Sequence, residues 1–173
     1  AYVLRRAVHS PTAADETQPP AVVNATIKVT LDNALDVREL SYTPYGRVLF
    51  SRLQAADGQT RMADGATVLH PGDRVLAIGP DEAVRHITKQ LGRRSKLQLE
   101  QDRSELDFRR IILSQKRFYG RTIADLNLWD KLGARATRVR RGDQDFLATD
   151  DFLLQAGDRI RVAAPRTQMS KVA

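Results

Sequence analysis

Hydrophobic and polar residues follow the same order of elements in both halves of the chain. In the first half, alternating β-branched residues predict a strand, and apolar residues that recur every three or four positions predict a closing helix. Between them, an Asp-Gly pair predicts a hairpin turn, and a Pro-Gly pair precedes a further strand. The predicted strand, short helix, hairpin, turn with strand, and helix occupy residues 25–31, 35–42, 46–65, 66–79 and 81–91.

The pattern of the second half predicts the same series of elements. The strand, helix, hairpin, and turn with strand occupy residues 106–114, 122–133, 134–148 and 152–165. Thr122 is expected to cap the helix, with Asp125 in the position of a capping box. Four apolar residues then fall on one helical stripe that we expect to be buried: Ile123, Leu126, Trp129 and Leu132. A ligand-stacking role remains the alternative to a core position for Trp129.

One motif occurs twice. The segment LHPGDRVLAIGP at 69–80 recurs as LQAGDRIRVAAP at 154–165. A single copy of a few strands and two helices would enclose a thin core, so two packed copies would bury more apolar area, at about 25 cal/mol per Å². The predicted fold class is α+β, with two tandem repeats of a small, mostly antiparallel sheet and flanking helices. The expected segments are a juxtamembrane tail or linker at 1–23, repeat 1 at 24–91, a basic linker at 92–104 and repeat 2 at 105–173.

The net charge of +7 is unevenly distributed. Basic and acidic residues balance over 1–91, whereas 104–173 hold 14 basic and 9 acidic residues. Phosphate or anionic lipid headgroups are candidate partners for this surplus, and a well-solvated basic surface is the alternative. No run of 18 apolar residues is present, so we expect the chain as given to be soluble. It begins without Met and has no signal-peptide pattern, which suggests a fragment of a longer chain.

Three motifs of the second half resemble the TrkA-C domain, the C-terminal regulatory module of potassium-conductance regulators. YGRTIADLNL is similar to the start of the family's helix, ARATRVRRGD to its basic strand and Gly turn, and LLQAGDRIRV to its Gly-Asp segment. The first half keeps VLHPGDRVLAIGP and LDVREL, but Asn33 and Ala34 stand where the Gly-Arg pair precedes the helix. The resemblance covers 24–91 and 105–173.

Tandem TrkA-C modules without a preceding nucleotide domain resemble the cytoplasmic insert of the aspartate–alanine exchanger family. This resemblance implies a regulatory domain of a membrane transporter, at the cytoplasmic side of the inner membrane. The implied partners are transmembrane helices of the same full-length chain, an unidentified small-molecule effector and a possible second copy in a homodimer. The apolar start followed by Arg5 and Arg6 is typical of the cytoplasmic end of a membrane helix. No G-x-G-x-x-G motif is present, so neither NAD nor another cofactor is expected.

Arg138, Arg140 and Arg141 are the candidate ligand-binding residues. Two of them share one face of the predicted strand and the third lies at its turn, so three guanidinium groups could clamp a phosphate or a carboxylate. The alternative is an exposed hairpin edge protected by charge. The Gly-Asp pairs at 72–73 and 157–158 are interpreted as structural, with Gly adopting a positive φ and Asp accepting hydrogen bonds from turn amides.

Motifs for catalysis are absent from the sequence. It has no cysteine, its three histidines lack metal-ligand spacing, and no P-loop, G-x-S-x-G or H-E-x-x-H motif occurs. We therefore expect neither enzyme activity nor a metal site. A ligand-binding module of a potassium uptake or channel system remains an alternative function. A nucleic-acid-binding module is disfavoured, because the basic residues lack interleaved aromatic residues.

Overall fold

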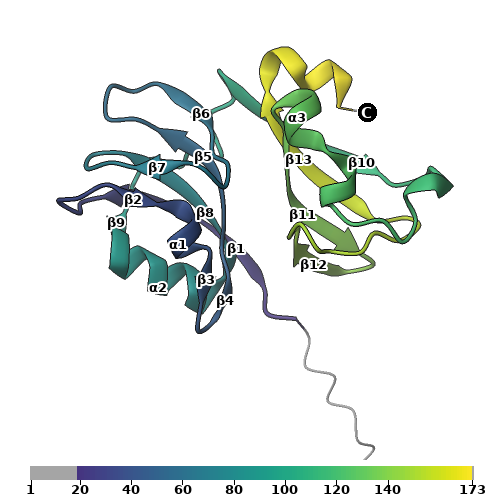
Figure 1. Cartoon of the computed structure of the whole chain (residues 1–173), viewed down its shortest axis with the longest axis horizontal. Helices are drawn as coiled ribbons and strands as arrows, with labels where there is room; N and C mark the ends of the chain where they lie inside the picture. The colour runs from purple at the N-terminus through teal and green to yellow at the C-terminus, as the bar shows by residue number, and fades with distance from the viewer. Residues whose placement is uncertain (1–18, 173) are drawn as a thin grey trace, which may run out of the picture.

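The structure, a computed structural model, describes residues 19–172 and contains two main antiparallel sheets (Figure 1). The strands of the first sheet are β1 (Val22–Val29), β5 (Leu49–Gln54), β6 (Thr60–Met62), β8 (Arg74–Pro80) and β9 (Gly92–Arg94). Those of the second sheet are β10 (Leu106–Ile112), β11 (Arg135–Arg141), β12 (Gln144–Leu147) and β13 (Arg159–Pro165). The first sheet runs in the order β6-β5-β8-β1-β9, and the second in the order β12-β11-β13-β10.

Short helices and strand pairs complete both halves. The helices are α1 (Val37–Leu40), α2 (Asp81–Leu91) and α3 (Leu128–Leu132). The 3-10 helices are η1 (Lys116–Phe118), η2 (Ala124–Leu126) and η3 (Arg166–Lys171). In the first half, β2 (Leu35–Asp36) pairs with β7 (Val68–Leu69), and β3 (Tyr42–Thr43) pairs with β4 (Gly46–Arg47).

The two halves are copies of one folding unit. Their strand orders make β1, β5, β6 and β8 equivalent to β10, β11, β12 and β13. The copies also share an irregularity, because β5 shifts register between Phe50 and Arg52, and β11 between Ala136 and Arg138. A bulge at the same place in both sheets is hard to explain without duplication. The predicted α+β fold, with tandem repeats of a small antiparallel sheet, is confirmed.

Each half encloses a core of its own. In the first half, Ile27 and Phe50 from the sheet pack in one cluster with Ile87 of α2. In the second half, Val139 and Ile160 lie at the centre of the equivalent cluster. Successive side chains of a strand point to opposite faces, so each sheet keeps a second face for other contacts.

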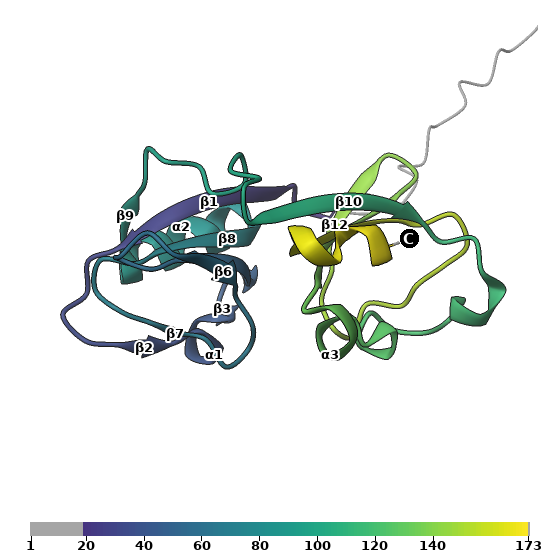
Figure 2. The ribbon, with the colours of Figure 1, turned by 90° about the horizontal axis from the view of Figure 1, so that it is seen from above.

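The two halves lie side by side and meet along a seam (Figures 1 and 2). Met62 of the first sheet packs there with Leu106 and Ala163 of the second. A further buried cluster at the outer face of the first sheet contains Leu49, Leu76, Ile78 and Leu99, with Val22 and Leu147 packed against it. Apolar side chains that one copy would leave exposed are therefore buried by pairing within the chain.

The Gly-Asp turns have the structural role predicted for them. Gly72 and Gly157 adopt φ values of 91° and 80°, which favour glycine. Oδ2 of Asp73 accepts a hydrogen bond from the backbone N–H of His70 at 2.8 Å. Oδ2 of Asp158 accepts one from the backbone N–H of Gln155, also at 2.8 Å. Both buried carboxylates thus hold their turns closed.

The predicted helix at 122–133 is broken, and the expectation that Trp129 is buried was wrong. The capping box is present, since the N–H of Thr122 donates to Oδ2 of Asp125 at 2.8 Å and Oγ1 of Thr122 accepts from the N–H of Asp125 at 3.3 Å. Asn127 then adopts a left-handed conformation with φ 47° and separates η2 from α3. The stripe loses its register at this break, so Trp129 remains 39% exposed.

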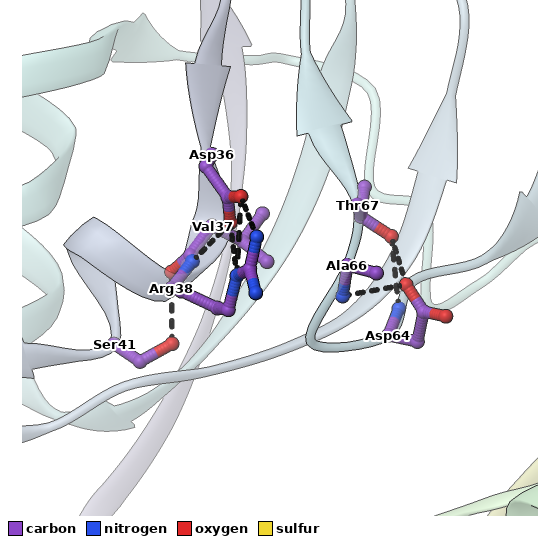
Figure 3. A network of polar contacts seen from close by, with 7 residues as sticks. All are labelled: Asp36, Val37, Arg38, Ser41, Asp64, Ala66 and Thr67. Atoms are coloured by element: carbon purple, nitrogen blue, oxygen red, sulfur yellow. Dashed lines mark hydrogen bonds and ion pairs between the residues drawn. The ribbon is translucent and has the colours of Figure 1, made fainter.

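Asp36 and Asp64 order two neighbouring loops of the first half (Figure 3). A side-chain oxygen of Asp36 accepts a hydrogen bond from the N–H of Arg38 at 2.8 Å and caps α1. Oδ1 of Asp64 accepts hydrogen bonds from the N–H of Ala66 at 3.0 Å and from Oγ1 of Thr67 at 2.9 Å. Within residues 19–172, the second oxygen of Asp64 accepts no hydrogen bond and remains available.

The predicted juxtamembrane tail falls mostly outside the described residues. Its role and the four predicted segment boundaries stay predictions. Within the part of the chain that the structure describes, no helix is both long enough and apolar enough to cross a membrane.

Candidate anion-binding site

Five arginines gather on the outer face of the second sheet. Arg161 of β13 pairs in register with Arg110 of β10 on one side and with Arg138 of β11 on the other. In the next row, Arg159 of β13 pairs with Arg140 of β11. Residues at alternate positions of a strand share a face, so these strands bring the five side chains together. They line a cavity of about 240 Å³, and we call them the arginine array.

Few negative charges compensate the arginine array. Among the described residues, Asp145 is the only carboxylate that lines the cavity, with its Oδ2 at 3.8 Å from Nη1 of Arg138. Nη2 of Arg138 donates a hydrogen bond to Oδ1 of Asn24, in the first half, at 2.6 Å. The guanidinium of Arg161 stacks on Phe108, with 3.7 Å between its Cζ and the ring centroid. Asn24 and Phe108 therefore orient Arg138 and Arg161, and the single carboxylate of Asp145 leaves most of the positive charge of the array uncompensated.

Burial and mutual repulsion both act on these arginines. The pKa of Arg161 is lowered by burial and by the nearby guanidinium groups of Arg138 and Arg110. Burial also lowers the pKa of Arg138, against an opposite effect of Asp145. Arginine nevertheless stays protonated at neutral pH. The repulsion therefore persists in the free protein, and a bound anion would relieve it.

The chemistry of the array suits a compact anion with several charges. Guanidinium groups form paired, charge-assisted hydrogen bonds with phosphate and carboxylate oxygens. Arg110, Arg140 and Arg159 are exposed and reachable from solvent, whereas Arg138 and Arg161 lie deeper. A phosphate group offers more acceptor oxygens and more negative charge than a single carboxylate, so the array favours phosphate-class anions.

The structure brings together two of the three arginines predicted from the sequence. Arg138 and Arg140 both line the array cavity, whereas Arg141 has a different environment. Its Nε and Nη2 each donate to one carboxylate oxygen of Asp158 at 2.8 Å, and Nη2 also donates to the carbonyl oxygen of Leu153 at 2.8 Å. These hydrogen bonds to Asp158 raise the pKa of Arg141. Arg141 therefore holds the second Gly-Asp turn and does not join the other two.

Three members of the array were missed by the sequence reasoning. Arg159 and Arg161 alternate along the last strand, a spacing that places both on one face and could have been used. Arg110 comes from a strand that is distant in the sequence and adjacent to β13 in the sheet. A ligand role for Arg138, Arg140 and these three residues stays a prediction.

The first sheet has a face equivalent to the array. There Leu76 of β8 pairs with Thr26 of β1 and with Arg52 of β5. This arrangement repeats that of Arg161 between its two arginine neighbours. By this register, Arg52 of β5 corresponds to Arg138 of β11. It is the only one of the three equivalent positions that carries arginine in both sheets.

The connecting segment, residues 95–105, covers this equivalent face. Nη1 of Arg52 donates to the carbonyl oxygens of Leu99 at 2.9 Å and Asp102 at 2.6 Å. Oγ1 of Thr26 accepts a hydrogen bond from the N–H of Leu99 at 3.0 Å. Peptide groups of the connecting segment thus occupy this face of the first sheet. On the second sheet, the equivalent face is open, and the arginine array lines a cavity there.

Comparison with known protein families matches residues 108–173 to the TrkA-C domain. The second half of this chain is a TrkA-C domain. All five residues of the arginine array lie within the matched region. The TrkA-C domain therefore supplies the whole array, and the first half supplies Asn24 and the opposite side of the seam.

Curated relatives of the chain are named as uncharacterized transporters. The chain is 42% identical over 137 residues to one from Geobacter sulfurreducens, covering 79% of this chain and 25% of that protein. It is 33% identical over 163 residues to one from Cutibacterium acnes, covering 94% and 31%. A relative from Symbiobacterium thermophilum is 39% identical over 128 residues, covering 70% and 24%. The chain thus spans between 24% and 31% of the length of these relatives, and the match extends beyond the TrkA-C domain.

Proposed function

We propose that this chain is a cytoplasmic regulatory domain of a membrane transporter, controlled by a phosphate-class anion bound at the arginine array. The names and the greater length of the relatives support a membrane part in the full protein. The observation that carries the ligand assignment is the array itself, in which five arginines and one carboxylate line a single cavity. A role without catalysis, at the cytoplasmic side of the inner membrane, is part of this proposal.

Two residues of the array also make contacts at the seam, so an anion bound to the array can affect the seam. Arg138 is bonded to Asn24 of the first half, and Arg161 lines a small cavity at the seam together with Arg52. An anion that draws Arg138 or Arg161 toward itself alters contacts between the halves. A ligand shifts such an equilibrium only when it binds one arrangement more tightly. A site at the array would meet this condition, because the attraction of its guanidinium groups for an anion depends on their spacing.

The transporter proposed is of the aspartate–alanine exchanger type. The support is the similarity of a tandem TrkA-C arrangement to the cytoplasmic insert of that family. Hydrophobic segments on both sides of this chain in the full-length protein would agree with it. A dinucleotide-binding domain directly before the chain would instead favour the regulatory module of a potassium system. Pairing of two chains stays a prediction.

Replacing both Arg140 and Arg159 with glutamine is expected to weaken binding of pyrophosphate at least tenfold. Neither side chain makes a hydrogen bond or an ion pair within residues 19–172, so the substitutions remove charge with little effect on folding. A hydrogen bond to a charged group contributes about 1.5–3 kcal/mol, and about 1.4 kcal/mol corresponds to a factor of ten in affinity. Calorimetric titration of this chain with pyrophosphate measures the effect.

The matched control removes two exposed positive charges elsewhere, with Arg61→Gln and Arg93→Gln in one variant. It should retain the affinity of the unmodified chain, and an equal loss in both variants would contradict a site at the array. Vesicles containing an anionic phospholipid form a second arm. A lipid headgroup would be the source of the phosphate if the chain binds these vesicles more tightly than pyrophosphate and the variant with Arg140→Gln and Arg159→Gln loses this binding.

The regulatory role is tested in proteoliposomes that contain the full-length transporter. We expect pyrophosphate to change the rate of aspartate uptake against internal alanine, and the Arg140→Gln, Arg159→Gln variant to lose this response while keeping the rate without pyrophosphate. A response that survives in the variant would exclude the array as the regulatory site. The absence of aspartate–alanine exchange in the unmodified protein would contradict the transporter type.

A further inference from the structure

A second cavity, of about 380 Å³, opens where the first half meets the region of α3. Asp64 contributes to it from the first half, and Trp129 and Arg135 contribute from the second. The break at Asn127 explains the place of Trp129, because it leaves this side chain partly exposed beside the cavity. This volume lies within the range of small-molecule sites. We call the cavity the Trp129 cleft.

Arg135 brings a positive charge to the Trp129 cleft. Its Nη1 donates to the carbonyl oxygen of Ala63 at 3.2 Å, which fixes the side chain across the seam. Within residues 19–172, its guanidinium makes no further hydrogen bond and no ion pair within 4.0 Å. Burial lowers the pKa of Arg135, and the carboxylates of Asp150 and Asp64 act in the opposite direction. A guanidinium has five N–H donors, so most of them remain for a ligand.

The carboxylates of the cleft also make no ion pair with the residues that the structure describes. Asp64, Asp130 and Asp150 all line it. The hydrogen bonds to Asp64 use one of its oxygens and leave the other without a partner (Figure 3). The side chains of Asp130 and Asp150 accept no hydrogen bond from the described residues. Arg135 and these carboxylates therefore line one cleft without forming an ion pair within 4.0 Å among the described residues, and a ligand that carries both charges could bridge them.

We propose that the Trp129 cleft binds a free α-amino acid. Its carboxylate pairs with Arg135, its ammonium group pairs with Asp150, and its side chain lies against Trp129. A simple anion would face three carboxylates, and a simple cation would leave Arg135 without a partner, whereas a zwitterion pairs with both kinds of charge. The cleft shares no lining residue with the arginine array, and the proposal does not depend on the proposed function.

The experiment uses the intrinsic fluorescence of Trp129, which is the only tryptophan of the chain. L-leucine is titrated beside two analogues that each lack one charge: 3-methylbutylamine without the carboxylate and 4-methylpentanoate without the ammonium group. We expect L-leucine to change the fluorescence saturably and each analogue to bind at least tenfold more weakly. Binding of either analogue with the affinity of L-leucine would overturn the proposal. No saturable response to L-leucine, L-alanine or L-aspartate would overturn it equally.

Two variants assign the response to the cleft. Asp150→Asn changes an exposed side chain without a hydrogen-bond partner in the described residues, and Arg135→Gln keeps a donor for the carbonyl oxygen of Ala63. Each should weaken L-leucine binding at least tenfold while the melting temperature shows that the chain is folded. Arg93→Gln, an exposed arginine outside both cavities, is the control and should leave binding unchanged. Unaltered affinity in Asp150→Asn and Arg135→Gln would place the response elsewhere.

Discussion

The Asp158→Ala variant is expected to lose about 3 kcal/mol of unfolding free energy, the cost of breaking a largely buried ion pair. Asp158 is fully buried and accepts two hydrogen bonds from Arg141 and one from the N–H of Gln155. Its removal leaves the guanidinium of Arg141, which is 32% exposed, without its carboxylate partner. Urea unfolding followed by Trp129 fluorescence, which reports on the second half, measures the loss.

Asp73→Ala provides the matched control in the first half. Asp73 occupies the equivalent turn and accepts a hydrogen bond from the N–H of His70, but no arginine bonds to it within residues 19–172. Its loss should cost about 1–2 kcal/mol, as expected for one hydrogen bond to a charged group. Circular dichroism, which reports on the secondary structure of both halves, measures the loss in this variant. Equal losses in the two variants would contradict a stabilising role for Arg141.

The same ion pair predicts how stability depends on pH. Burial acts to raise the pKa of Asp158, but the hydrogen bonds from Arg141 and from the N–H of Gln155 outweigh it and lower the pKa. A carboxylate with a lower pKa in the folded state stabilises the fold above its unfolded pKa of about 3.9 and loses this effect as the pH falls through the folded pKa. Asp158→Asn should therefore lose less stability than the unmodified chain when the pH is lowered from about 5 to about 3.

Leu99→Ala is the second change with a large expected effect, at about 3 kcal/mol. Leu99 lies in the connecting segment, is fully buried, and packs with Leu76 and Ile78 of the first sheet. Truncation leaves a cavity at the seam that the surrounding strands cannot fill by moving. Leu97→Ala is the matched control, because Leu97 belongs to the same segment and is 46% exposed. It should change stability by less than about 0.5 kcal/mol.

Urea unfolding of both leucine variants tests whether the segment is a structural part of the seam. Similar losses in the two variants would mean that the connecting segment is not held on the first sheet in solution. A large loss in Leu99→Ala alone would agree with the hydrogen bonds that Arg52 donates to its carbonyl groups.

The strands and turns could be predicted because their determinants are local. Alternating apolar residues predict β1, a continuous apolar run predicts β8, and glycine with a positive φ closes each Gly-Asp turn. The break at Asn127 could not be predicted in this way. The N–H groups of Ile123 and Ala124 donate to the carbonyl oxygens of Phe152 and Asp150, so a segment distant in the sequence redirects the helix.

The arginine array was only partly predictable for a related reason. Arg138 and Arg140 lie on one predicted strand, and their common face followed from the period of two. Arg110 and Arg161 join them through the order and register of strands that are far apart in the chain. Cross-strand register depends on packing across the whole sheet, which local patterns do not encode.

Fusion of the two copies into one polypeptide lets their outer faces evolve independently. In a symmetric pair of identical chains, each mutation would alter both faces at once. Here the first face is permanently filled by the protein's own backbone at Leu99, and the second face keeps its cavity. A pseudo-symmetric molecule of this kind should take up a single anion per chain, with a stoichiometry of one instead of two.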